Sequence, residues 1–93
     1  MIIGVLEVDI RLFSCNSLKD KRRVIKSLIS RIRNNFNVSI AEVGDYDLWQ
    51  RTHLGIAFLS SDTSYSNKVL DKILEFIKKE REIFVIDSRK EIL

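Results

Sequence analysis

The stretch S-L-K-D-K-R-R-V-I-K-S-L-I-S-R-I-R-N-N-F, residues 17–36, decides the fold. Ser17 stands where a helix N-cap belongs, and Asp20 three residues later occupies the acid position of a capping box. Six apolar side chains then share one face at helical spacing: Val24, Ile25, Leu28, Ile29, Ile32 and Phe36. The pattern therefore predicts an amphipathic helix across this stretch.

The same predicted helix is strongly basic. It holds seven Lys or Arg against one acid, a local net charge of +6, whereas the whole chain carries +3. The rest of the chain therefore carries −3, so the positive charge is confined to this segment. Five cations share a second face of the helix: Lys19, Arg22, Arg23, Lys26 and Arg33. Lys21 falls near the apolar face, and we expect its stem to lie along the core while its ammonium group reaches water.

Length and composition predict a single domain, residues 1–93. Cys15 is the only cysteine, which excludes an internal disulfide and favours a reducing compartment. The N-terminus lacks the basic region and the cleavage site of a signal peptide, and no apolar run is long enough to span a membrane. We therefore expect a cytoplasmic protein with no membrane partner.

Four strands and a second helix complete the predicted chain. The expected strands are residues 2–13, 37–43, 52–60 and 83–86, and the second helix begins at Ser61 or Asp62 and runs to about residue 80. Its expected buried stripe is Tyr65, Val69, Leu70, Ile73, Leu74 and Ile77. A charged tail follows residue 86. The order β-α-β-β-α-β predicts an α+β, ferredoxin-like domain, with a four-stranded antiparallel sheet and both helices on one face.

The other face of that sheet is predicted to be partly apolar. Alternation within the two central strands places Ile3, Val5, Ala57 and Leu59 on it. A bare apolar sheet face is a liability for a monomer. We therefore expect a homo-oligomer, a dimer or larger, that buries these residues.

The segment D-L-W-Q-R, residues 47–51, carries two large apolar side chains in an expected loop. Leu48 and Trp49 forgo much transfer free energy if they stay in water. Three interpretations stay open. The two side chains close one end of the domain's own core, they pack against a second copy with Arg51 or Asp47 pairing across the boundary, or they dock an external partner.

Several segments together resemble a known family. They are S-L-K-D-K-R-R-V-I-K-S-L at 17–28, F-N-V-S-I-A-E-V at 36–43, D-L-W-Q-R at 47–51 and L-G-I-A at 54–57. They look like the YlxP-like bacterial proteins, which are grouped as a domain of unknown function. The resemblance implies a ferredoxin-like fold and a small cytoplasmic protein, often encoded beside translation-factor and ribosome-maturation genes. It implies no catalytic residues.

The usual signatures of catalysis and of metal or cofactor binding are missing. His53 and Cys15 offer a formal catalytic dyad, but they stand in different predicted elements and nothing orients the imidazole. Asp45 and Asp47 are more simply interpreted as turn formers than as metal ligands. A Gly-rich phosphate loop, G-x-S-x-G and H-E-x-x-H are all absent. We expect no enzyme activity, metal, cofactor or small-molecule substrate.

Two hypotheses for function follow, beside the simpler interpretation that the basic face is only solvated. The first is a non-enzymatic module associated with RNA or the ribosome, in which the five clustered cations contact phosphates. The central strands lack aromatic residues at the positions where an RNA recognition motif stacks bases, so we expect contact through backbone and shape. The alternative is a protein-interaction or assembly module that uses the open sheet face and the loop at 47–51.

Overall fold

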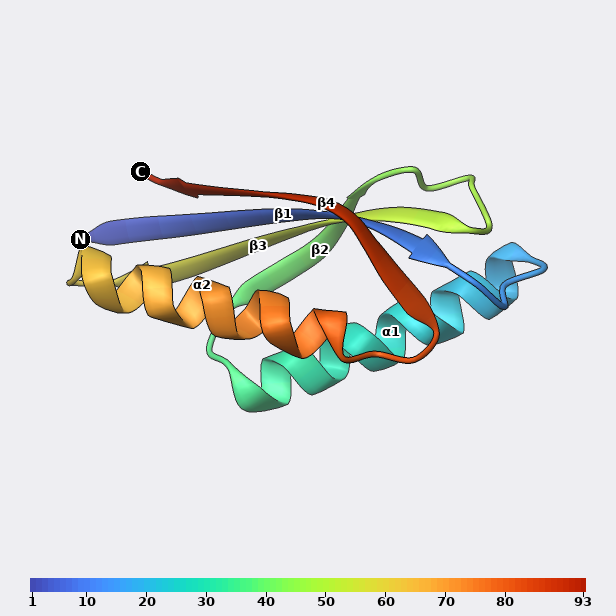
Figure 1. Ribbon diagram of the computed structural model, residues 1–93, viewed down its shortest axis with the longest axis horizontal. Coiled ribbons are helices and arrows are strands. Elements are labelled where there is room, and N and C mark those ends of the chain that lie inside the picture. Colours follow the sequence, from blue (N-terminus) through green and yellow to red (C-terminus); the bar gives the residue numbers. More distant parts are fainter.

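The computed structural model describes residues 1–93 and has the predicted order of elements. They are β1 (Ile2–Leu12), α1 (Leu18–Asn35), β2 (Ser39–Gly44), β3 (Arg51–Ser60), α2 (Thr63–Lys78) and β4 (Ile83–Ile92). The strands form one sheet in the order β2-β3-β1-β4, and every neighbouring pair is antiparallel. Both helices cover the same face of this sheet (Figure 1). The predicted ferredoxin-like α+β fold is confirmed.

The core lies between the helices and the covered face of the sheet. Alternate residues of the central strands point into it, and Val8, Ile10 and Leu54 are fully buried. Helix residues Leu28, Ile32 and Ile73 meet them there. Gly4 lets α2 approach β1 closely, because a Cβ at this position would lie 3.0 Å from Leu70 Cδ1. The predicted core face of the two central strands is therefore correct.

The predicted start of α1 is correct as well. Ser17 is the N-cap, and its hydroxyl accepts a hydrogen bond from the Asp20 backbone N–H at 3.1 Å. The Asp20 carboxylate accepts from the backbone N–H of Asn16, at 3.2 Å, instead of from that of Ser17. Asp20 thus completes a variant of the capping box, in which the reciprocal bond reaches one residue further back.

The last strand is longer than predicted. Residues 83–86 were expected to form it, with a charged tail behind, but β4 runs from Ile83 to Ile92 and pairs with nearly the whole of β1. Pairing is made by backbone groups, so an edge strand tolerates the polar run D-S-R-K-E, whose five side chains are all exposed. The register shifts between Asp9 and Ile10, where Ile86 is the extra residue of a bulge.

One member of the predicted buried stripe of α2 is exposed. Tyr65 is 56% accessible, and its ring lies 5.8 Å from the ring of Phe58. Ser66 occupies the buried position of the first turn instead. At 100° per residue, residue 66 lies in the middle of the buried set Val69, Leu70, Ile73 and Ile77, whereas residue 65 lies about 100° away at its edge. Neither helix has the length and apolar character needed to cross a membrane.

Candidate nucleic-acid interface

The seven cations of α1 fall into two groups in the structure. Lys21 and Arg31 are neutralised by carboxylates, Lys21 by Glu42 and Arg31 by both oxygens of Glu80. The other five are exposed and pair with no carboxylate, although Arg33 donates to the Ile40 carbonyl at 3.3 Å. They are Lys19, Arg22, Arg23, Lys26 and Arg33, the same five that the helical pattern predicted to share a face.

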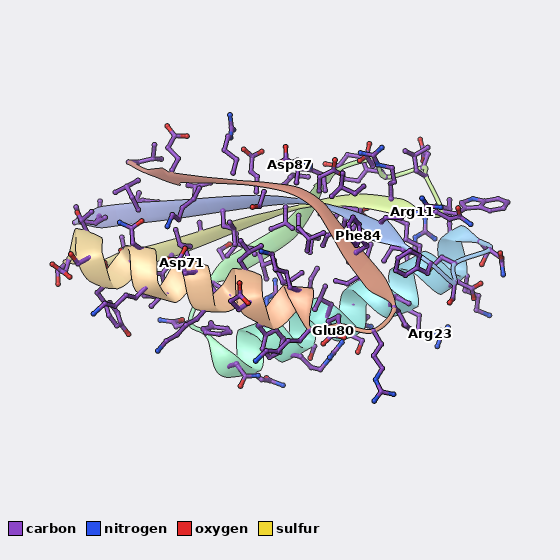
Figure 2. All side chains as sticks on the ribbon, in the orientation of Figure 1. Arg11, Arg23, Asp71, Glu80, Phe84 and Asp87 are labelled. Atoms are coloured by element: carbon purple, nitrogen blue, oxygen red, sulfur yellow. The ribbon has the colours of Figure 1, made fainter.

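These five residues form what we call the basic face. From Lys19 to Arg33 it extends over about 21 Å of helix at 1.5 Å per residue. Figure 2 places Arg23 on the helical side of the molecule, whereas Asp87 projects from the other side of the sheet. The buried residues Ile25, Leu28 and Ile32 fix α1 against the sheet, so the cations start from a rigid backbone.

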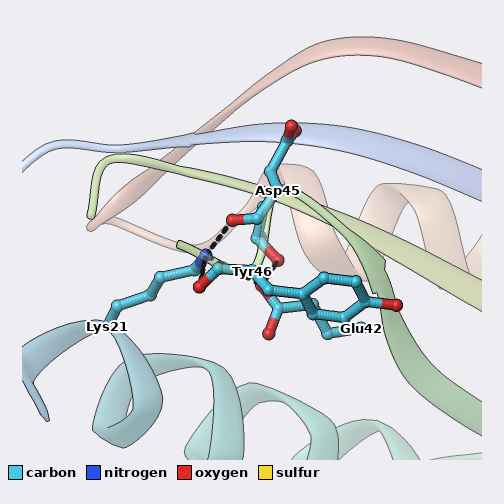
Figure 3. A network of polar contacts seen from close by, with 5 residues as sticks. Lys21, Glu42, Asp45 and Tyr46 are labelled. Carbon is cyan, nitrogen blue, oxygen red and sulfur yellow. Dashed lines mark hydrogen bonds and ion pairs between the residues drawn. The ribbon is translucent and has the colours of Figure 1, made fainter. Parts of the chain in front are cut away.

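Lys21 does not reach water, contrary to the prediction. It is 1% exposed, and its Nζ lies 2.9 Å from Glu42 Oε2. The ammonium group also donates to the carbonyl oxygens of Asp45, at 2.5 Å, and Tyr46, at 3.3 Å (Figure 3). All three of its protons thus have an acceptor, which is what makes a buried ammonium tolerable.

The Lys21 contacts tie the loop between β2 and β3, residues 45–50, to the first turns of α1. Asp45 has a φ of 58°, in the left-handed region that Asp tolerates better than most residues. Its carbonyl also accepts from the Leu48 backbone N–H at 3.1 Å, which closes a turn. Glu42 in addition accepts from the Thr52 hydroxyl at 2.7 Å, so the network joins α1, β2, the loop and β3.

The turn holds its two apolar side chains outside the core. Leu48 is 49% exposed and Trp49 is 51% exposed. Together with Phe84 and Ile86 of β4 they line a groove of about 810 Å³, which we call the Trp49 groove. Four polar residues complete its lining: Arg11, Asp47, Gln50 and Arg51. Figure 2 shows Arg11 and Phe84 close together, and they are register partners on β1 and β4.

The predicted interface residues lie in two separate patches of the open face. Ile3 pairs with Leu59 and Val5 with Ala57, so these four make one patch at the N-terminal end of β1. Leu48, Trp49 and Arg51 lie at the opposite end, in the Trp49 groove. Leu59 is 61% exposed. The structure therefore does not join the predicted interface into one surface.

A charged belt separates the two patches. Glu7 accepts from Arg89 and lies 3.3 Å from His53 Nε2, and Arg51 donates to Asp9 at 2.6 Å. The hydrogen bond from Arg89, and then the one from His53, hold the pKa of Glu7 below its usual range. Glu7 and Asp9 thus each have a guanidinium partner within the belt.

Cys15 and His53 do not form a dyad. Cys15 is 2% exposed and belongs to the core, whereas His53 lies on the open face beside Glu7. Burial raises the pKa of the Cys15 thiol, and the negative charges of Asp20 and Glu82 raise it further. The thiol is therefore protonated and unreactive at neutral pH. No group of three His, Cys, Asp or Glu side chains is arranged to hold a metal ion.

Phe84, an exposed aromatic residue of the open face, was missed at the level of the sequence. Phe84 and Phe13 are 57% and 55% exposed, and the guanidinium carbon of Arg11 lies 6.0 Å from the Phe13 ring centroid. The alternation in residues 83–86 could have indicated its position, because Ile83 faces the core and the next residue, Phe84, therefore faces away from it. Trp49 joins them only because the loop folds toward β4.

Comparisons with known proteins agree with the motifs. Residues 3–90 match the family described as "Protein of unknown function (DUF503)". The chain is 44% identical over 82 residues to "Uncharacterized protein YlxP" of Bacillus subtilis (strain 168). The aligned region covers 88% of this chain and 89% of that protein. Among solved structures it is similar to "De novo designed protein Foldit4", with a TM-score of 0.59, 22% identity and 96% of each chain covered. That last likeness concerns the fold alone.

Proposed function

The chain belongs to the DUF503 family, which confirms its resemblance to YlxP-like proteins, and we propose that it is a non-enzymatic module that binds the phosphate backbone of RNA through α1. Five residues of the basic face make the contact: Lys19, Arg22, Arg23, Lys26 and Arg33. The partner is an RNA, free or as part of the ribosome.

One observation carries this proposal: the fold neutralises two cations of α1 and leaves the other five unpaired on one face. Surface cations that serve only solubility are usually interspersed with acids. Here the single acid of the helix, Asp20, is engaged in the N-terminal cap. The positive field of the helix is therefore not compensated locally and favours a polyanion.

Binding of this kind reads the backbone and not the sequence. Each cation that meets a phosphate releases counterions, which supplies the free energy of association. Side chains in fixed positions on a rigid helix lose less freedom on contact than those of a disordered basic tail. We therefore expect affinity for structured RNA that depends weakly on sequence and strongly on salt.

The test is a double charge reversal, Arg23→Glu with Lys26→Glu, at the centre of the basic face. Both residues are exposed and unpaired, so the variant should fold normally and lose RNA binding in a fluorescence-anisotropy titration. The matched control is Lys68→Glu with Lys72→Glu, which makes the same change in net charge on two exposed, unpaired lysines of α2. Equal losses in both variants, or unchanged affinity in the first, would contradict the proposal.

A second candidate function is self-association as an assembly module, favoured by the apolar patch of Ile3, Val5, Ala57 and Leu59. This patch carries no charge, so two copies related by a twofold axis can pack it against itself without opposing like charges. Sedimentation velocity at micromolar concentration should then show a species larger than the 10.9 kDa chain. Leu59→Asp should return it to the monomer, and a monomer in both proteins would dismiss this candidate.

A further inference from the structure

We propose that the Trp49 groove binds an unpaired nucleobase of the RNA whose backbone lies along α1. The base stacks on the indole of Trp49 and on the ring of Phe84, and the guanidinium of Arg11 meets the adjoining phosphate. This inference rests on the proposed function and deepens it, because it names the kind of RNA: a duplex next to a single-stranded segment.

The chemistry of the groove suits a nucleotide. Trp49 and Phe84 are 51% and 57% exposed, so each offers a free aromatic surface, and bases of any sequence stack on such surfaces. Arg11 pairs with no carboxylate and is exposed, whereas Arg51 is already engaged by Asp9. Gln50 donates weakly to the Cys15 carbonyl, at 3.5 Å, and its side-chain oxygen has no partner. Sites that bind an unstacked base commonly combine an aromatic ring, on which the base stacks, with polar groups such as a guanidinium or an amide that hydrogen-bond to it.

The groove and the basic face are joined through Lys21. The buried ammonium holds the carbonyls of Asp45 and Tyr46, so the loop that carries Trp49 is fixed to the first turns of α1. Figure 1 shows this loop at the same end of the molecule as the N-terminus of α1. Lys19 and Arg22 stand on either side of Lys21 in the chain. A nucleic-acid strand that leaves the basic face at this end and turns toward the open face of the sheet therefore meets the groove.

The position and charges of the groove favour RNA over a second copy of the chain as the occupant. Its one guanidinium group without a carboxylate partner is that of Arg11, and the groove lies at the end of the molecule where the basic face begins (Figure 1). A contact with a second copy would bury the charged side chains of Arg11 and Asp47 in both copies, which costs desolvation free energy. The uncharged patch at the other end of the sheet is better suited to self-association, so the groove is left for an anionic ligand.

The experiment compares two probes on the intact protein: a short blunt RNA duplex, and the same duplex with a single-stranded adenine overhang. We expect the overhang to improve affinity about tenfold, the effect of stacking roughly one base. Because Trp49 is the only tryptophan, its emission should be quenched by the overhang probe and not by the blunt duplex.

Variants separate stacking from simple apolar contact. Trp49→Leu keeps an apolar side chain without an aromatic surface and should abolish the tenfold gain, whereas Trp49→Phe should keep part of it. Tyr65→Leu, at an exposed aromatic residue of α2 outside the groove, is the control and should keep all of it. Affinity for the blunt duplex should be the same in the wild type and in all three variants.

Three results would overturn the inference. Equal affinity for both probes with unchanged Trp49 emission would dismiss the groove as a base site, while binding to the blunt duplex would still support the basic face. A gain that survives Trp49→Leu would place the single strand elsewhere. Emission that depends on protein concentration without RNA would assign the groove to a second copy. Failure to bind either probe would remove the proposed function and this inference together.

Discussion

Replacing Lys21 by Met tests the buried ammonium that joins α1 to the loop between β2 and β3. Met keeps the length of the stem and its apolar packing but removes all three hydrogen bonds of Nζ. The Glu42 carboxylate, whose side chain is 23% exposed, then keeps only the Thr52 hydroxyl as partner. Removing one member of a buried pair costs about 3–5 kcal/mol, and the partial exposure of Glu42 places this change near the lower end.

The assay is urea unfolding followed by circular dichroism, with Trp49 emission as a second probe of the loop. Lys26→Met, an exposed lysine on the same helix, is the control and should change the free energy of unfolding by less than about 0.5 kcal/mol. Adding Glu42→Gln to Lys21→Met should recover part of the loss, because a neutral amide still accepts from Thr52 and no longer leaves a buried charge. A loss under about 0.5 kcal/mol for Lys21→Met would refute the buried network.

Three further predictions concern the core, the charged belt and the cysteine. Leu28→Ala should cost about 2–5 kcal/mol in urea unfolding, since Leu28 is fully packed between α1 and the sheet; a loss near zero would mean that the helix face is misassigned. Arg89→Ala should raise the pKa of Glu7 in an NMR titration, because the hydrogen bond from Arg89 is the largest cause of its lowering. In the wild type the stabilising effect of Glu7 is present above the usual carboxyl pKa and is lost as pH falls through the lowered value; an unchanged pKa in the variant would contradict this. Cys15 should react with a thiol reagent at neutral pH far more slowly in the native protein than in urea, and equal rates would contradict its burial.

Most of the fold follows from periodicity. The spacing of apolar residues in α1 and the alternation in β1 and β3 each specify which face is buried, and the structure follows both. The length of β4 could not be read in this way, because an edge strand is held by backbone hydrogen bonds that leave no pattern in the side chains. Tyr65 was misplaced because it lies at the edge of the buried stripe of α2, where a large aromatic side chain can turn outward while the small Ser66 takes the buried position.

The surroundings of Lys21 and Trp49 could be foreseen only in part. The helical spacing placed Lys21 near the apolar face but did not predict that its ammonium group is buried, because the two carbonyl acceptors come from a loop more than twenty residues away in the chain. The Trp49 groove likewise joins residues of β1, the loop and β4 that no local pattern connects. The basic face was simpler, since all five members lie on one helix and their exposure follows from its phase.

The dependence of RNA affinity on salt tests most directly whether the basic face binds phosphates. If about four of its five cations each meet a phosphate of a duplex, the logarithm of the association constant should fall with the logarithm of the salt concentration at a slope of about −3 to −4. The measurement needs only the wild-type protein, a blunt RNA duplex and a titration series at several salt concentrations. A slope of that size supports contact through the basic face. A slope near zero, or no binding at low salt, would contradict it.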